Sequence, residues 1–137
     1  MTVSAQNLSV SYGRSTIVHS LSFDPLEGGT VVGLIGPNAA GKSTLVKAIA
    51  GIKKPTAGSV TISKGGAELT GRDRVEAIGY VPQDLLSSAT LTAFESVMVS
   101  ARRRGVDGWD PLERTADVMH RLGITHLSDR LVSDMSG

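Results

Sequence analysis

The chain has 137 residues, enough for one domain with its own hydrophobic core, and its Lys and Arg number 14 against 13 Asp and Glu. A net charge of +1 excludes a global electrostatic attraction to nucleic acid or to an anionic membrane. The absence of cysteine excludes disulfides, thiolate catalysis and cysteine-ligated zinc, and the lack of a long apolar run or an export signal predicts a cytoplasmic protein.

The first elements predicted along the chain are a β-hairpin, a buried strand and a helix. Alternating apolar residues predict antiparallel strands over 3–12 and 16–23. Residues 30–35 form a continuous apolar run, which is typical of a strand covered on both faces. Good helix formers over 42–50 predict a helix that ends at Gly51. This part of the chain therefore reads as strand, glycine-containing loop and helix.

Two further strands and two helices follow. Short apolar patterns at 59–63 and 77–81 predict the strands. Thr92 and Glu95 have the spacing of a capping box at the start of a helix. Asp110 is followed by proline, which predicts a second helix with an aspartate N-cap and proline at its first position. Together these elements predict an α/β fold.

One segment carries a motif with a specific chemistry. Residues 36–43 match G-x-x-x-x-G-K-[ST] in full and lie between the predicted buried strand and the helix. In such a loop the backbone N–H groups point at phosphate oxygens, and the helix adds its positive end. Lys42 supplies an ammonium for the β- and γ-phosphates, and Ser43 offers a hydroxyl to Mg²⁺. The expected nucleotide-binding residues here are Gly36, Pro37, Asn38, Ala39, Ala40, Gly41, Lys42, Ser43 and Thr44.

A phosphate loop alone is compatible with kinases, GTPases and motor ATPases, so the flanking residues are needed to distinguish these classes of protein. Tyr12 ends an early strand, and Pro-Thr-Ala-Gly at 55–58 follows the loop helix. Gly-Tyr-Val-Pro-Gln at 79–83 ends the next strand, and Met-Ser-Gly stands at 135–137. In this order the motifs resemble those of the ATP-binding cassette (ABC) family, and the resemblance runs over the whole chain.

The resemblance implies roles for residues outside the loop, with ATP and Mg²⁺ as the ligands. Tyr12 is similar to the aromatic residue that stacks on adenine, a contact that needs little base selectivity. Gln83 is similar to the Q-loop glutamine, which contacts Mg²⁺ and the attacking water. Lys42 and Gln83 are then the catalytic candidates. The alternatives are a core aromatic for Tyr12 and an ordinary polar loop residue for Gln83.

The strand and helix patterns, together with the resemblance, give the expected domain organisation. A P-loop core with an antiparallel β subdomain covers 1–85, a small helical subdomain covers 86–133, and the signature motif starts in 134–137 with Ser136 and Gly137. In the family the Walker B strand and its water-polarising glutamate follow the signature, so the chain is expected to end before them. We therefore expect the 137-residue chain to bind ATP without hydrolysing it, and the longer subunit that it resembles to be an ATP hydrolase.

The phosphate loop departs from the family at one position, where Ala39 replaces the usual glycine. Alanine adopts a positive φ only with strain. Ala39 therefore has either an ordinary backbone conformation or a strained one, and the difference bears on how strongly the loop binds phosphate.

The resemblance points to a transporter subunit. Residues 91–97 are similar to the corresponding segment of importers for iron-siderophore, haem and cobalamin complexes. Such an ATPase is expected to pair with a second copy and with integral membrane permease subunits, and to lie on the inner face of the cell membrane. The competing functions are a soluble ABC protein that acts on nucleic acid or ribosomes and a non-hydrolytic nucleotide-binding fragment. Nucleic acid is not an expected partner, because Arg102, Arg103 and Arg104 close a predicted helix where cations are favoured.

Overall fold

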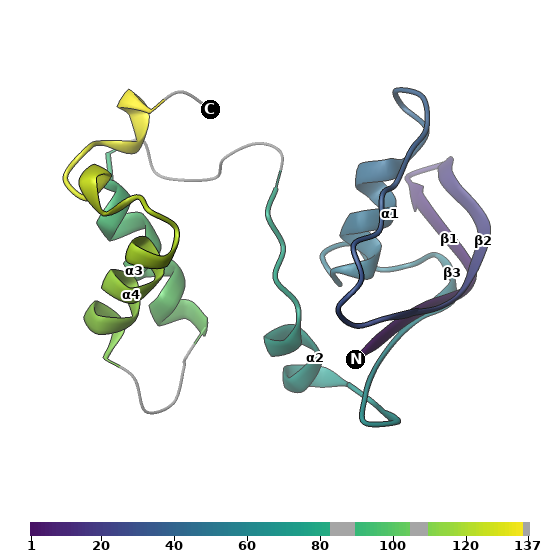
Figure 1. Cartoon of the computed structure of the whole chain (residues 1–137). Helices are drawn as coiled ribbons and strands as arrows, with labels where there is room; N and C mark the ends of the chain where they lie inside the picture. The colour runs from purple at the N-terminus through teal and green to yellow at the C-terminus, as the bar shows by residue number, and fades with distance from the viewer. Residues whose placement is uncertain (83–89, 105–109, 136–137) are drawn as a thin grey trace. The chain divides into compact units, whose positions relative to one another are not determined.

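The computed structural model describes residues 1–82, 90–104 and 110–135. It divides into two compact units, Met1–Tyr80 and Val81–Gly137, which are described separately. Figure 1 shows the sheet and helix α1 in the first unit and helices α3 and α4 in the second. The boundary expected after residue 85 falls within 83–89, which lie outside the described residues. No helix within the described part of the chain is long and apolar enough to cross a membrane.

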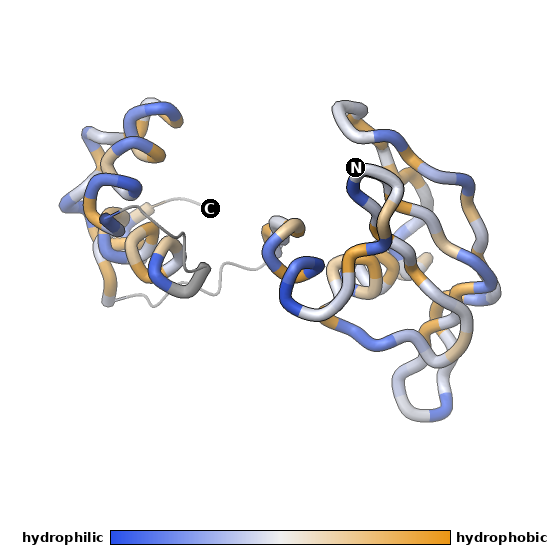
Figure 2. Tube along the Cα trace, turned by 90° about the horizontal axis from the view of Figure 1, so that it is seen from below, coloured by the Kyte–Doolittle hydropathy of each residue, from blue (hydrophilic) through white to orange (hydrophobic). Residues whose placement is uncertain are grey.

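The first unit is built on an antiparallel sheet with the strand order β2-β1-β3-β4. The strands are β1 (Thr2–Tyr12), β2 (Ser15–Glu27), β3 (Ala57–Lys64) and β4 (Ala67–Glu68). The predicted N-terminal hairpin is confirmed, since β1 pairs with β2 from Thr2 opposite Glu27 to Tyr12 opposite Ser15. Figure 2 shows hydrophobic and hydrophilic residues alternating along these strands, as a sheet with one covered face requires.

Helix α1 (Lys42–Ile49) covers one face of this sheet and closes the core of the unit. It is the helix predicted after the glycine loop, and Gly51, with φ +76°, follows its end. Its buried side chains are Leu45 and Ala48. They pack in one cluster with buried strand residues Ala5, Leu8, Val10, Val18, Val60 and Ile62. The predicted α/β fold class is therefore correct. The core of the first unit includes side chains of α1, the helix that follows the glycine loop.

The two strands predicted at 30–35 and 77–81 do not form, so that prediction is wrong for the chain as described. Val31 and Ile35 are fully exposed. An apolar run shows that a segment is suited to burial, but a strand also needs neighbours that satisfy its N–H and C=O groups. Within residues 1–82 no strand pairs with either segment, and Figure 1 shows the segment before α1 as an extended trace.

A short helix, α2 (Gly71–Ala77), was not predicted. Arg72 Nε lies 2.5 Å from Glu76 Oε1, a pair at i,i+4 spacing on an exposed surface. This contact, through its hydrogen bond and the Glu76 charge, raises the pKa of Arg72. Arg74 Nη1 donates to Val60 O at 3.0 Å and so ties α2 to strand β3. The i,i+4 spacing of Arg72 and Glu76 was the one feature of the sequence that could have indicated this helix, although a surface ion pair contributes little stability.

The second unit contains α3 (Ala93–Arg104) and α4 (Pro111–Arg121) with the short 3-10 turns η1 (Thr125–Leu127) and η2 (Val132–Asp134). The predicted capping box is confirmed, because Thr92 N donates to Glu95 Oε2 at 2.9 Å and Glu95 N donates to Thr92 Oγ1 at 3.2 Å. At α4 the predicted N-cap is confirmed as well, since Asp110 Oδ1 accepts from Leu112 N at 3.0 Å.

The two helices of this unit are held together by a small core and by backbone bonds from the C-terminal turns. Thr115 and Met119 of α4 are buried, and the Thr115 hydroxyl donates to Pro111 O at 2.7 Å. Val132 N donates to Leu91 O at 2.9 Å, which anchors η2 at the start of α3.

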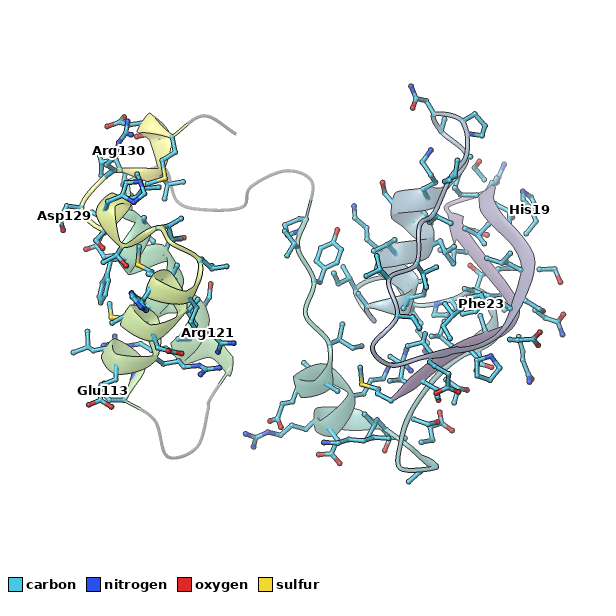
Figure 3. All side chains as sticks on the ribbon, in the orientation of Figure 1. His19, Phe23, Glu113, Arg121, Asp129 and Arg130 are labelled. Atoms are coloured by element: carbon cyan, nitrogen blue, oxygen red, sulfur yellow. The ribbon has the colours of Figure 1, made fainter. Side chains whose placement is uncertain are left out.

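Figure 3 shows Glu113 and Arg121 at opposite ends of α4, where their charges complement the helix dipole.

Candidate functional site

The glycine loop leads directly into helix α1. Ala40 N donates to Pro37 O at 3.3 Å, and Leu45 N donates to Gly41 O at 2.8 Å as the first bond of the helix. Gly41 is the N-cap residue and has the left-handed conformation, with φ +87°. The loop therefore closes on itself in one turn and presents the N-terminus of α1.

Gly41 is required by space as well as by conformation. A Cβ at this position would lie 3.0 Å from Ile17 Cγ2 and 3.1 Å from the Ile17 carbonyl oxygen on strand β2. Both contacts are tighter than an ordinary van der Waals distance, and a side chain at φ +87° is strained in any case. The second glycine of the motif thus lets α1 begin against the sheet.

Ala39 adopts the strained alternative of the two that the sequence left open, with φ +64°. An L-residue in the left-handed region costs roughly 1–2 kcal/mol. The loop holds this conformation although a glycine would adopt it without strain.

We expect Ala39→Gly to raise the free energy of unfolding by up to about 1 kcal/mol, because the relief of strain exceeds the added entropy of the unfolded chain. The matched control is Ala40→Gly, whose φ is not positive. This control should lower the free energy of unfolding by roughly 0.4–1 kcal/mol. Urea denaturation measures both variants, and equal losses of stability in the two would contradict the strain at Ala39.

Lys42 folds back over the loop that precedes it. Its Nζ donates to Gly36 O and to Pro37 O, each at 2.6 Å. Within residues 1–82 the backbone N–H groups of Lys42, Ser43 and Thr44, in the first turn of α1, have no hydrogen-bond acceptor. A cationic side chain and a set of free amide donors therefore meet at one helix terminus.

This donor set fits a chain of phosphate groups. Free N–H groups at a helix N-terminus and a neighbouring ammonium are the groups that bind phosphate oxygens. The Ser43 side chain, on an exposed residue in the same turn, fits Mg²⁺, which takes oxygen ligands and retains several waters.

An open apolar pocket of about 340 Å³ lies beside the loop, inside the first unit. Side chains of β2, among them Ile17, Val18 and Leu21, form its wall together with Leu34. Lys42 is its cationic edge. Because the wall is apolar, the pocket does not itself suit phosphate, and the anion-binding groups are confined to the Lys42 side.

Tyr12 lies at the end of β1 and is 45% exposed. Lys53 Nζ lies 4.4 Å from the centroid of its ring. A residue with this exposure is not packed inside the core, and Tyr12 is not a member of the core cluster of the first unit. The ring therefore has surface available for a planar partner, and the contact with Lys53 was not foreseen from the sequence.

Comparison with known proteins decides the family of the chain. The family described as ABC transporter matches residues 18–137. The chain belongs to the ABC transporter family. A solved structure of an ATP-binding subunit of an ABC transporter has a TM-score of 0.78 at 23% identity, and the match covers 99% of this chain and 56% of that one. The predicted ABC-type fold is thus confirmed.

Two curated relatives are ATP-binding proteins whose names give different roles. The linearmycin resistance ATP-binding protein LnrL of Bacillus subtilis (strain 168) is 35% identical over 136 residues, which cover 97% of this chain and 42% of LnrL. The hemin import ATP-binding protein HmuV of Gloeobacter violaceus is 35% identical over 112 residues, which cover 80% of this chain and 41% of HmuV. This ABC chain therefore spans less than half the length of these two relatives.

Several site residues expected from the ABC resemblance lie outside the described residues. They are Gln83, Ser136 and Gly137. Of the residues that the structure describes, it brings together Lys42, Ser43 and the loop 36–41 at the start of α1.

The histidines of this ABC chain are dispersed. His19 lies on the edge strand β2, His120 on α4 and His126 on η1 (Figure 3 for His19). Among the residues that the structure describes, no three His, Cys, Asp or Glu side chains are grouped to hold a metal ion.

Lys53 is the residue at this site that sequence reasoning missed. Its only signal was its place in a Lys-Lys-Pro sequence directly after the loop helix. That position does not show contact with Tyr12, which lies 41 residues earlier, and the pairing of β1 with β3 brings the two segments together.

Proposed function

We propose that this chain is the Mg-ATP-binding part of an ABC transporter ATPase subunit. The observation that carries the proposal is the junction of the loop with α1, where the Lys42 ammonium and the free amides of the first helical turn meet. Lys42 then binds the β- and γ-phosphates, Ser43 binds Mg²⁺, and the loop amides bind the remaining phosphate oxygens.

We assign adenine recognition to Tyr12, at the exposed end of β1. A stacking partner binds through the face of its ring, so it needs exposure more than hydrogen-bonding groups. Gln83 keeps its proposed role beside Mg²⁺ and the attacking water, and Ser136 and Gly137 keep theirs in the signature motif, all three by family resemblance.

For the whole protein we propose ATP hydrolysis coupled to transport. The subunit would act as a homodimer with integral permease subunits, in the cytoplasm on the inner face of the cell membrane. Metal-chelate uptake is the substrate class that we favour, supported by residues 91–97 and by the hemin importer among the relatives. LnrL, an ATP-binding protein named for linearmycin resistance, does not support uptake.

Calorimetric titration with Mg-ATP tests the proposed site directly. We expect saturable binding of Mg-ATP and weaker but measurable binding of Mg-tripolyphosphate, since the phosphates supply the charge and the base supplies only stacking. Absence of binding for both ligands to folded protein would contradict the function. A soluble ABC protein acting on ribosomes, the second candidate, would instead sediment with ribosomes from a cell extract and not with membranes.

We expect Tyr12→Ala to lower the affinity for Mg-ATP by about 5- to 100-fold, because base stacking on an aromatic ring contributes about 1–3 kcal/mol. Tyr12→Trp should stay close to the original affinity, since it retains a stacking face. Both affinities are measured by calorimetry. Equal losses in the two variants would instead assign Tyr12 to packing.

A further inference from the structure

The contact between Lys53 and Tyr12 is the least expected polar contact of the first unit. Lys53 Nζ lies 4.4 Å from the centroid of the Tyr12 ring, within the range in which a cation is attracted to an aromatic face. Lys53 is partly buried, whereas Tyr12 is 45% exposed. The ammonium therefore covers part of the ring and leaves another part open.

The backbone fixes Lys53 in this place. Ile52 N and Lys53 N both donate to Lys47 O in the last turn of α1, at 2.9 and 3.1 Å. Shortly after Lys53, Thr56 is tied to the end of β1. Its N–H donates to Ser9 O at 2.8 Å, and its hydroxyl accepts from Ser11 N at 3.0 Å. The segment that carries Lys53 is thus anchored at both ends, to α1 and to β1.

We propose that Lys53 is a positioning residue for nucleotide binding, which acts through Tyr12 by holding its ring in the orientation that a base stacks on. The proposal rests on the proposed ATP site. A surface tyrosine at a strand end loses side-chain freedom when a ligand stacks on it, and this loss weakens binding. A cation held over one face removes part of that freedom in advance and leaves the open face for the base.

The link to the phosphate site is built into the same helix. Lys42 begins α1, and the turn that ends α1 presents Lys53 to Tyr12. One rigid element of about two turns thus positions both the phosphate-binding ammonium and the cation that orients the aromatic ring.

A lysine at this position could have two other roles. It could be a charge that attracts phosphate, or it could cover the ring and so block stacking. Each role predicts a different effect on ligand binding when the lysine is replaced.

The test replaces Lys53 by methionine, which keeps the aliphatic stem and removes the charge. Calorimetry with Mg-ATP should show about two- to fivefold weaker binding, the effect of a cation–π contact at an accessible site. Binding of Mg-tripolyphosphate, which has no base, should be unchanged. Lys53→Arg should retain the ATP affinity, and Lys54→Ala, which removes the neighbouring charge, should affect neither ligand. In a Tyr12→Ala background, Lys53→Met should have no further effect on ATP.

Four results would overturn the proposal. Equal losses for ATP and tripolyphosphate would make Lys53 a phosphate-attracting charge, and a gain in ATP affinity would make it a cover over the ring. No change for either ligand, or the same loss in the Tyr12→Ala background, would separate Lys53 from base binding. Urea denaturation shows, independently of binding, whether each variant is folded. Failure of the unsubstituted protein to bind either ligand would instead contradict the proposed function.

Discussion

Replacing Lys42 by alanine is expected to lower the affinity for Mg-ATP by about 10- to 100-fold, since hydrogen bonds to charged groups contribute about 1.5–3 kcal/mol. The Lys42 ammonium is held at the loop by Gly36 O and Pro37 O, so it is already positioned beside the free amides of α1. Without it, those amides would have to hold a highly charged triphosphate with no compensating side-chain cation.

The control for this variant lies on the same helix. Lys47→Ala removes an equal charge from the last turn of α1, at the end of the helix opposite the phosphate loop. It should lower the affinity for Mg-ATP by much less than Lys42→Ala does, because the phosphates are expected at the first turn of α1 and Lys47 lies in the last. Calorimetry measures both variants, and urea denaturation shows whether each remains folded. Similar affinities for the two variants would refute the phosphate role of Lys42.

Gly58→Ala is expected to lower the free energy of unfolding by about 3 kcal/mol or more, through backbone overlap added to conformational strain. Gly58 has φ +72° and lies in β3 where the register against β1 shifts, between Gln6 and Ser9. A Cβ at this position would overlap the carbonyl oxygens of Gln6 and Asn7. Backbone atoms cannot move aside as a flexible side chain can, so β1 and β3 would have to separate locally.

Gly66→Ala is the matched control for this effect. Gly66 also has a positive φ, +84°, but a Cβ there would meet nothing within 4 Å. Its substitution should therefore cost only the conformational strain, about 1–2 kcal/mol. Urea denaturation of the two variants isolates the overlap as the difference between them. If Gly66→Ala proved as destabilising as Gly58→Ala, conformational strain alone would account for both, and the close approach of β3 to β1 would not matter.

Local sequence was sufficient wherever an element is stabilised by its own residues. The Thr92 and Glu95 capping box and the Asp110 N-cap form as predicted, because each closes hydrogen bonds within three residues of itself. The loop before α1 follows the same rule, since Gly41 supplies both the left-handed conformation and the first helical acceptor. The hairpin of β1 and β2 also follows from neighbouring residues and a short turn.

Only the tertiary structure decided what depends on distant partners. The apolar run at 30–35 is suited to a sheet interior, but in the described residues no strand lies beside it, and its backbone groups cannot form a ladder alone. The positive φ of Ala39 and the contact of Lys53 with Tyr12 could not be predicted from the sequence either. A backbone angle depends on how the whole loop closes, and a contact across 41 residues depends on which strands pair. Sequence pattern thus predicted the β1–β2 hairpin and the helices α1, α3 and α4, while packing determined which further strands form, which strands pair and which side chains meet.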